Sequence, residues 1–318
     1  YLLVVQSMGQ PTASGGAAVL TMGTFVAFNS AFGNFMRGVE SLTETAVDII
    51  DSFAKQDIAK PIINAKPELD YSKEDPGQIN GEIDMRNVSF RYSEDGPYIL
   101  RDLSLKIHEG DFVAFVGPSG CGKSTLFRLL LGFEEPEIGS ILYNNQDISG
   151  LDINSIRRQI GTVLQTASIS AGSMFENIAS GLVITLDEAW TAAKDAGLDE
   201  DINAMPMGMH TLVSEGGGNL SGGQRQRLLI ARSLVTNPKI LLFDEATSAL
   251  DNRTQEIVSR SISRRNVTRL VIAHRLSTIE DADHIVVLNK GNIEQQGTFD
   301  SLKKEKGMFS RMISRQTV

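Results

Sequence analysis

The chain has 318 residues, enough for one large domain or two smaller ones, and its 41% hydrophobic and 22% charged residues are typical of a folded protein with a buried core. A formal net charge of -9 argues against nucleic acid as the main partner, because nucleic-acid-binding surfaces carry an excess of Lys and Arg. The single cysteine excludes an internal disulfide framework and fits a reducing compartment.

Residues 1–36 contain no Asp, Glu, Lys, Arg or His, and Arg37 is the first charged residue of the chain. Residues 1–5 and 17–28 are strongly apolar, and a segment with three Gly and one Pro, residues 9–16, separates them. This pattern predicts the end of one membrane span, a short turn and a second span that runs to about Phe35. A buried core helix with a leading loop is the alternative. A signal peptide fits less well, since the stretch lacks a basic start and a cleavage site.

Apolar residues recur at helical spacing over residues 40–63, which predicts a long helix that leaves the membrane for water. A polar segment with several Pro residues follows and is typical of a linker. Because the chain starts with Tyr and not Met, we interpret it as a piece of a longer protein. The predicted parts are the remnant of a transmembrane domain at residues 1–60, a linker at 61–80 and a globular domain at 81–318.

The globular part opens with two segments of alternating polarity, residues 83–92 and 99–107, which predict an antiparallel sheet. Short apolar strands then alternate with helical segments, a pattern that predicts a parallel sheet covered by helices on both faces. A helical subdomain is expected over about residues 150–235. The strands are expected at residues 112–116, 160–164, 240–243 and 270–273, and the helices at 123–131, 187–196, 223–234 and 254–264.

A glycine-rich loop at residues 117–125 lies between a predicted strand and a predicted helix and matches G-x-x-x-x-G-K-[ST], the phosphate-binding P-loop. In such a loop, backbone N–H groups wrap the β-phosphate and the lysine, here Lys123, bridges the β- and γ-phosphates. The hydroxyl of the next residue, Ser124, binds Mg²⁺. The candidate nucleotide-binding residues are Gly117, Ser119, Gly120, Cys121, Gly122, Lys123, Ser124 and Thr125.

Two adjacent carboxylates, Asp244 and Glu245, follow the apolar strand at residues 240–243. Asp244 is suited to hold Mg²⁺ through water, and Glu245 to act on the attacking water as a general base. Carboxylates at a strand end are more often caps or solvated charges. The preceding P-loop and the run of residues 246–251 favour the catalytic interpretation.

The LSGGQ segment, residues 220–224, forms a second candidate anion site ahead of a basic stretch with helical character. Adjacent glycines let backbone N–H groups approach a phosphate, Ser221 adds a hydroxyl, and the helix that starts near Gln224 points its positive dipole end at the same anion. One nucleotide has a single terminal phosphate. Either one of the two sites is idle, or two copies of the chain share two nucleotides head to tail.

Together with Ala273-His274-Arg275, these motifs resemble in order and spacing the ATP-binding domain of ABC transporters, over about residues 81–318. The resemblance implies an α/β fold, that of a P-loop NTPase with a mixed β-sheet core, an antiparallel β subdomain and an α-helical subdomain, here preceded by a remnant of an α-helical transmembrane domain. It implies ATP and Mg²⁺ as cofactors. It also implies that each nucleotide held by one copy is contacted by the LSGGQ segment of the other, through Ser221, Gly222, Gly223 and Gln224.

Further roles are implied by position in the family's motifs. Tyr92 matches the aromatic residue that stacks on adenine, and Gln165 matches the glutamine that touches the metal and the water. His274 matches the histidine that contacts the γ-phosphate. The plainer alternatives are an edge-strand aromatic for Tyr92 and a surface amide for Gln165. The resemblance thus implies a catalytic set of Glu245, His274, Lys123 and Gln165, and a metal-binding set of Ser124, Gln165 and Asp244.

A membrane segment fused ahead of the ATPase resembles the exporter branch of the family, and residues 20–35 are similar to exporters of ribosomal peptides or bacteriocins. The expected function is ATP-driven export of a peptide or natural product across the inner (plasma) membrane, with the ATP-binding domain on the cytoplasmic side. The expected partners are a second copy or a homologous half-transporter, the chain's own transmembrane domain and the exported substrate, but no nucleic acid. The alternatives are a non-transport ABC ATPase and a regulatory module that binds ATP without turnover.

Overall fold

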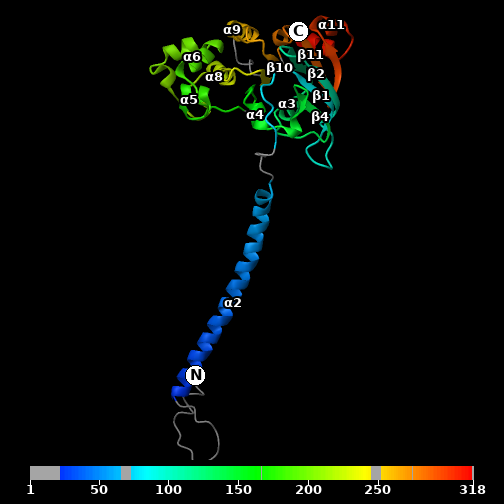
Figure 1. Cartoon of the computed structure of the whole chain (residues 1–318). Coiled ribbons are helices and arrows are strands. Elements are labelled where there is room, and N and C mark those ends of the chain that lie inside the picture. Colours follow the sequence, from blue (N-terminus) through cyan, green and yellow to red (C-terminus); the bar gives the residue numbers. More distant parts are fainter. Residues whose placement is uncertain (1–21, 66–72, 166, 245–251, 274, 317–318) are drawn as a thin grey trace, which may run out of the picture. The chain divides into compact units, whose positions relative to one another are not determined.

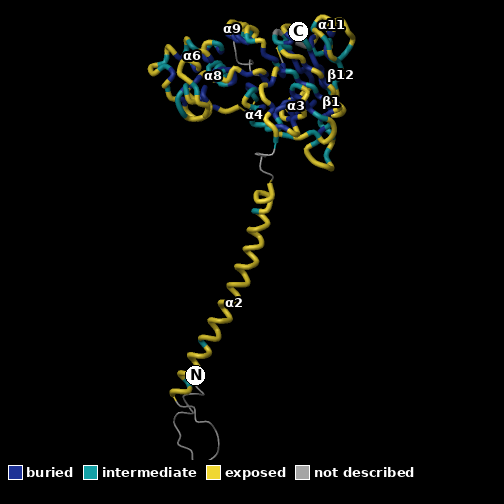
Figure 2. Tube along the Cα trace, viewed as in Figure 1, coloured by how far each residue is buried: buried dark blue, intermediate teal, exposed yellow. Residues whose placement is uncertain are grey.

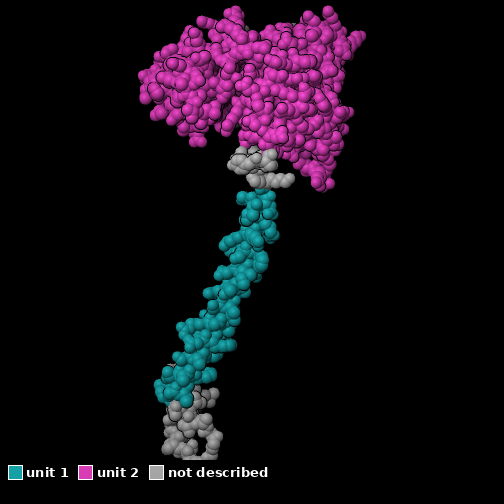
Figure 3. Space-filling view, viewed as in Figure 1, with its two compact units in different colours: residues 1–68 teal, residues 69–318 magenta. Residues whose placement is uncertain are grey.

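The computed structural model describes residues 22–65, 73–165, 167–244, 252–273 and 275–316 (Figure 1). The chain divides into two compact units, residues 1–68 and residues 69–318 (Figure 3). The first unit contains one long helix, and the second contains every described strand.

The helix α2 (Met22–Ile63) has no buried residue (Figure 2). It is one continuous helix over the later part of the predicted second span and the helix predicted over residues 40–63. Apolar residues form one strip along this helix, in which the spacing alternates between three and four residues. None of the charged residues between positions 37 and 55 belongs to the strip. This heptad spacing is typical of a helix that packs against other helices. The strip consists of Phe25, Phe28, Phe32, Phe35, Val39, Leu42, Ala46, Ile49 and Phe53.

Within the described ranges, no helix combines the length and the apolar content that a membrane crossing requires. The predicted end of a first span, residues 1–5, and the first residues of the predicted second span, 17–21, lie outside these ranges.

The second unit is built on a six-stranded sheet with the order β12-β11-β3-β10-β9-β6. Its strands pair in parallel except for β12, which pairs antiparallel with β11 at one edge. β3 and β9 are buried at every position, as expected for strands with both faces covered. The bounds are β3 (Phe112–Val116), β6 (Ile160–Val163), β9 (Ile240–Asp244), β10 (Thr268–Ile272), β11 (His284–Asn289) and β12 (Asn292–Gly297).

A separate four-stranded antiparallel sheet has the order β2-β1-β4-β5. Its main strands β1 and β2 alternate between buried and more exposed residues over most of their length, so that one face packs on the core and the other faces water. Two short strands, β7 (Gly172–Ser173) and β8 (Leu212–Val213), form a third pairing. The antiparallel sheet consists of β1 (Ile83–Phe90), β2 (Leu100–Ile107), β4 (Ile138–Tyr143) and β5 (Gln146–Asp147).

Two hydrophobic cores lie on the two faces of the six-stranded sheet. Side chains such as Phe243 and Val271 belong to one core, and their strand neighbours Leu242 and Ile272 belong to the other. The first core includes the helices between β6 and β9, and the second includes α3 and the antiparallel sheet. The helices of this unit are α3 (Lys123–Leu130), α4 (Ile153–Arg157), α5 (Met174–Ala179), α6 (Leu186–Asp195), α7 (Asp199–Ala204), α8 (Gly222–Leu234), α9 (Asn252–Ser263), α10 (Leu276–Glu280), α11 (Phe299–Lys304) and α12 (Met308–Gln316).

Capping boxes start three helices of the helical subdomain, α5, α6 and α8. At α5, the backbone N–H of Ser173 donates to Glu176, which holds the pKa of that carboxyl below its ordinary value. The same arrangement at Thr185 lowers the pKa of Glu188. These boxes fix where each helix begins.

The predicted fold class, a P-loop α/β fold with a mixed sheet, an antiparallel β subdomain and an α-helical subdomain, is confirmed. The predicted strands and helices of the globular part agree with the structure to within two residues at each end. The strand predicted over residues 83–92 ends at Phe90, and β10 starts at Thr268, earlier than predicted. The sequence pattern did not predict β4, β11 or β12.

Candidate nucleotide-binding site

The loop of residues 117–122 connects the end of β3 to the start of α3. Gly120 and Gly122 have φ angles of 77° and 107°, a left-handed conformation that glycine adopts without a steric penalty. A Cβ at Gly117 would lie 2.2 Å from the carbonyl oxygen of Leu288, whereas a Cβ at Gly120 would meet no atom within 4 Å. Gly117 is therefore required by packing, and Gly120 faces open space in which a ligand can approach the backbone.

The Lys123 side chain, at the start of α3, is held inside this loop. Its Nζ donates to the carbonyl oxygens of Gly117 at 2.8 Å and Pro118 at 3.0 Å, and the residue is 7% exposed. The Nζ also lies 3.8 Å from the Sγ of Cys121. The thiol of Cys121 is buried in the core, so this side chain is not available to a ligand in the pocket.

A pocket of about 350 Å³ lies beside the loop, at the carboxyl ends of β3, β9 and β10. Ligands of parallel α/β sheets bind at this end of the strands. The pocket brings together most of the predicted residues and adds two apolar ones, Ile99 and Ile272, that the sequence analysis missed. Of the predicted P-loop residues, Gly117 and Cys121 do not line it. The lining residues are Tyr92, Ile99, Ser119, Gly120, Gly122, Lys123, Ser124, Thr125, Gln165, Asp244 and Ile272.

Two oxygen atoms inside the pocket are suited to a magnesium ion. The Ser124 hydroxyl donates to Oδ2 of Asp244 at 3.1 Å, and the residue Asp244 is 7% exposed. Hydroxyl and carboxylate oxygens are ligands that Mg²⁺ accepts, usually together with water and substrate phosphates. Gln165 lines the same pocket with an exposed amide. The predicted metal-binding residues therefore lie together and fit Mg²⁺.

Tyr92 lies two residues after the end of β1, with 56% of its surface exposed. Its ring makes an edge-to-face contact with Phe90, with centroids 4.9 Å apart, and its hydroxyl is 3.3 Å from Oγ1 of Thr125. An exposed ring that lines the pocket and is held in place by a neighbouring aromatic ring can stack on a planar base.

The LSGGQ segment forms the start of α8. The hydroxyl oxygen of Ser221 accepts from the backbone N–H of Gln224 at 3.2 Å, and the Gln224 side-chain oxygen accepts from the backbone N–H of Ser221 at 2.9 Å. Ser221 and Gly222 are exposed, and a Cβ at Gly222 would meet no atom within 4 Å. The described residues that line the 350 Å³ pocket do not include Ser221, Gly222, Gly223 or Gln224. Within one chain, the two predicted anion sites are separate.

The predicted general base Glu245 and the predicted histidine His274 lie outside the described residues. Their roles stay predictions from the sequence.

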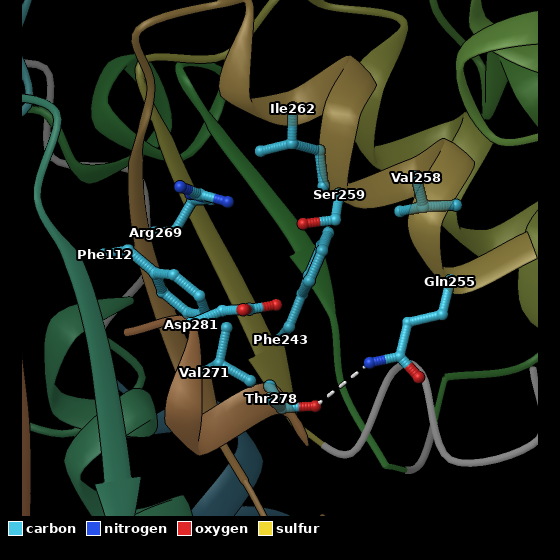
Figure 4. A pocket seen from close by; sticks show the side chains of 10 residues that line it. All are labelled: Phe112, Phe243, Gln255, Val258, Ser259, Ile262, Arg269, Val271, Thr278 and Asp281. Carbon is cyan, nitrogen blue, oxygen red and sulfur yellow. Dashed lines mark hydrogen bonds between the residues drawn. The ribbon is translucent and has the colours of Figure 1, made fainter. Parts of the chain in front are cut away.

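A smaller cavity, of about 50 Å³, lies on the opposite face of the sheet, between α9, α10 and the strands (Figure 4). Phe243 and Val271 line it, whereas the next residues along the same strands, Asp244 and Ile272, line the nucleotide pocket. Its size suits one or a few water molecules and excludes a nucleotide.

The two loop glycines predict different effects of the same substitution. Gly117→Ala is expected to lower the free energy of unfolding by about 3 kcal/mol or more, because the methyl group would collide with the backbone of Leu288. Gly120→Ala is expected to cost only about 1 kcal/mol of backbone strain. It should still weaken ATP binding by about tenfold or more, since the methyl group stands where a phosphate would approach. Urea unfolding and ATP titration of both variants measure the two effects, and equal stability losses would contradict the assignment.

Comparisons with known proteins give a consistent result. Residues 100–248 match the family model described as ABC transporter. The chain is 41% identical over 295 residues to the leukotoxin export ATP-binding protein LtxB of Aggregatibacter actinomycetemcomitans, covering 92% of this chain and 42% of that protein. It is 40% identical over 290 residues to the alpha-hemolysin translocation ATP-binding protein HlyB of Escherichia coli O157:H7, covering 90% and 41%.

A solved structure of a bacterial Atm1-family ABC exporter with ATP bound is similar to the chain with a TM-score of 0.79 and 35% identity, over 100% of this chain and 56% of that one. The chain spans less than half the length of the curated relatives that it matches here.

Proposed function

We propose that the chain binds ATP with Mg²⁺ and hydrolyses it to drive export, because residues 100–248 match the ABC transporter family model and the chain is similar in fold to an ABC exporter with ATP bound. The observation that carries the proposal is the pocket that joins Lys123 of the P-loop to Ser124 and Asp244. The relatives LtxB and HlyB are named for export and translocation, which favours an exporter over a non-transport ATPase.

In the proposed site, the loop N–H groups and Lys123 bind the phosphates of ATP. The Lys123 ammonium would exchange the carbonyl oxygens of Gly117 and Pro118 for phosphate oxygens. Ser124, Asp244 and Gln165 would hold Mg²⁺, which neutralises charge on the phosphates. Tyr92 would stack on the adenine.

The catalytic part of the proposal involves residues outside the described ranges. Glu245 would accept a proton from the attacking water, and His274, with Lys123, would stabilise the charge on the γ-phosphate. The sequence supports the role of Glu245, since this residue directly follows Asp244, which lines the pocket.

We further propose that the active site is shared by two copies of the chain. The exposed Ser221 and Gly222 lie at the N-terminus of a 13-residue helix and outside the chain's own pocket, so they are available to a phosphate bound elsewhere. The partner would be a second copy or a homologous half-transporter. Closure of the two copies over two nucleotides would then move the membrane part, and hydrolysis would let them reopen.

The cargo and the location belong to the same proposal. We propose a peptide or polypeptide cargo, which the relatives' names, leukotoxin export and alpha-hemolysin translocation, support as a class. The narrower interpretation as a bacteriocin exporter has support only from residues 20–35. The site of action would be the inner (plasma) membrane, with the ATP-binding domain on the cytoplasmic side. The uncovered apolar strip of α2 would pack against the transmembrane domain of the whole protein.

A shared site predicts that ATP turnover depends on protein concentration. Dilute, monomeric chain is expected to bind ATP but to release little phosphate, and the turnover per chain should rise as the concentration increases. Phosphate release over a concentration series, with sedimentation velocity on the same samples, measures this. Removal of Mg²⁺ with EDTA serves as the control and should abolish turnover at every concentration. A constant turnover per chain in samples that are monomeric would contradict the shared site.

A further inference from the structure

One carboxylate, that of Asp201, connects two helices at the LSGGQ segment. Asp201 lies in the first turn of α7, and its Oδ1 accepts a hydrogen bond from Nε2 of Gln224 at 2.8 Å. Its Oδ2 accepts from Nη2 of Arg227 at 2.7 Å. The side chains of Asp201 and Arg227 are only 26% and 15% exposed, so water screens this pair less than a surface pair. Gln224 and Arg227 are three residues apart and share one face of α8.

The other end of the Gln224 amide belongs to the capping box. Its oxygen accepts from the backbone N–H of Ser221, and its nitrogen donates to Asp201. An amide has one acceptor end and one donor end. With the amide reversed, an NH₂ group would face the N–H of Ser221 and an oxygen would face the carboxylate, and both contacts would be repulsive. Asp201 therefore determines which end of Gln224 faces Ser221.

The capping box in turn determines what Ser221 can offer. The Ser221 oxygen accepts from the backbone N–H of Gln224, and its backbone is held in an extended conformation with φ -64° and ψ 161°. Accepting a hydrogen bond leaves the hydroxyl proton available for donation. Ser221 and Gly222 are exposed, and in the part of the chain that the structure describes no acceptor is recorded for that proton.

We propose that Asp201 is a positioning residue for the LSGGQ segment, holding Gln224 so that Ser221 is set in advance to bind the γ-phosphate of a nucleotide on a second copy. The inference rests on the proposed function. Asp201 acts through Gln224 and Ser221, and it is not among the described residues that line the pocket of its own chain. Its effect should therefore appear on the nucleotide of the partner copy.

A simpler role would be purely structural. An acidic residue in the first turn of a helix favours that helix through its dipole, and the Asp201–Arg227 ion pair fastens α7 to α8. Both roles predict some loss of stability when Asp201 is removed. They differ in whether turnover falls beyond that loss and in which copy of a dimer carries the defect.

The first test is a set of three variants. Asp201→Ala is expected to lower ATP turnover at saturating ATP by about tenfold, with the ATP affinity of the monomeric chain unchanged. Asp201→Asn keeps an oxygen for Gln224 but loses the charge that pairs with Arg227, so it should recover most of the turnover. The matched control is Asp195→Asn, which weakens another ion pair of the helical region, with Arg265, and should lower stability without lowering turnover.

The second test mixes two variants that each have lowered turnover. Lys123→Ala protein added to Asp201→Ala protein forms dimers in which one intact P-loop faces one intact LSGGQ segment, so phosphate release should rise above the sum of the separate rates. The double variant Lys123→Ala/Asp201→Ala, added to Asp201→Ala protein in place of Lys123→Ala, should give no such rise, because neither chain then has Asp201. Ser221→Ala in place of Asp201→Ala is the positive control for exchange between dimers.

The outcomes separate the two levels of the inference. Wild-type turnover in Asp201→Ala, no recovery in Asp201→Asn, or rescue with Ser221→Ala but not with Asp201→Ala would each overturn the role of Asp201 and leave the proposed function standing. Absence of ATP turnover in the wild-type chain at dimer-forming concentrations, or full turnover in Lys123→Ala, would overturn the proposed function and this role with it.

Discussion

Replacement of Glu245 by Gln is expected to lower the rate of ATP hydrolysis by about 10²–10⁴-fold, because a neutral amide cannot accept the proton of the attacking water. ATP binding should persist, since the residues that line the pocket are unchanged. With ATP bound but not consumed, two copies should stay closed over the nucleotides. The measurements are phosphate release at saturating ATP, ATP titration, and size-exclusion chromatography with and without ATP and Mg²⁺.

The control for Glu245→Gln is Glu109→Gln, the same chemical change at an exposed turn between β2 and β3. This variant should keep wild-type turnover and should not gain an ATP-dependent dimer. Near-normal turnover in Glu245→Gln would mean that another group activates the water, and the general-base assignment would be wrong. Loss of ATP binding in the same variant would place Glu245 in the binding of the nucleotide instead.

The parts of the site that the sequence predicted are those in which a short motif carries both the residue and its structure. Lys123 and Ser124 follow a glycine loop between an apolar strand and a helix, and Asp244 ends a fully buried strand. In such motifs, the backbone conformation and the chemistry depend on neighbours in sequence, so the pattern predicts both. The same reason explains why the predicted strands and helices agree closely with the structure.

The parts that the sequence did not predict depend on contacts between distant segments. Ile99 and Ile272 look like ordinary strand residues, and only the assembled sheet places them at the pocket. Asp201 resembles any acidic residue in a first helical turn, and its proposed role follows from its hydrogen bonds to Gln224 and Arg227 of α8. β4 includes Gly139, which has a φ of 88° and lies close to the backbone of Arg86 and Asn87. The pairing of β4 with β1 is irregular there, so the polarity of the residues of β4 does not alternate as in a regular strand.

Replacement of Lys123 by Ala is expected to reduce ATP turnover by at least about 10²-fold and, unlike Glu245→Gln, to weaken ATP binding as well. The Nζ of Lys123 is the positive charge that the loop encloses, with the carbonyl oxygens of Gly117 and Pro118 at 2.8 and 3.0 Å. Its loss removes the attraction for the phosphates before any chemical step. ATP titration and phosphate release, with urea unfolding to measure stability, separate loss of binding from loss of fold.

Lys123→Arg keeps the charge and tests whether shape matters. The side chain is 7% exposed between loop carbonyl groups, and a planar guanidinium is too wide for a site that holds a compact ammonium, so this variant should also fail to hydrolyse ATP. Lys106→Ala, at an exposed ion pair with Glu82, is the control for the loss of one positive charge and should leave binding unchanged. If Lys123→Arg hydrolysed ATP normally, general charge attraction would explain the P-loop lysine. Dimer formation by Lys123→Arg is compared with that by Glu245→Gln: if Lys123→Arg binds ATP weakly and forms no ATP-dependent dimer while Glu245→Gln forms one, phosphate binding and general-base catalysis are carried by different residues. Closure of the two copies then requires ATP binding but not ATP hydrolysis.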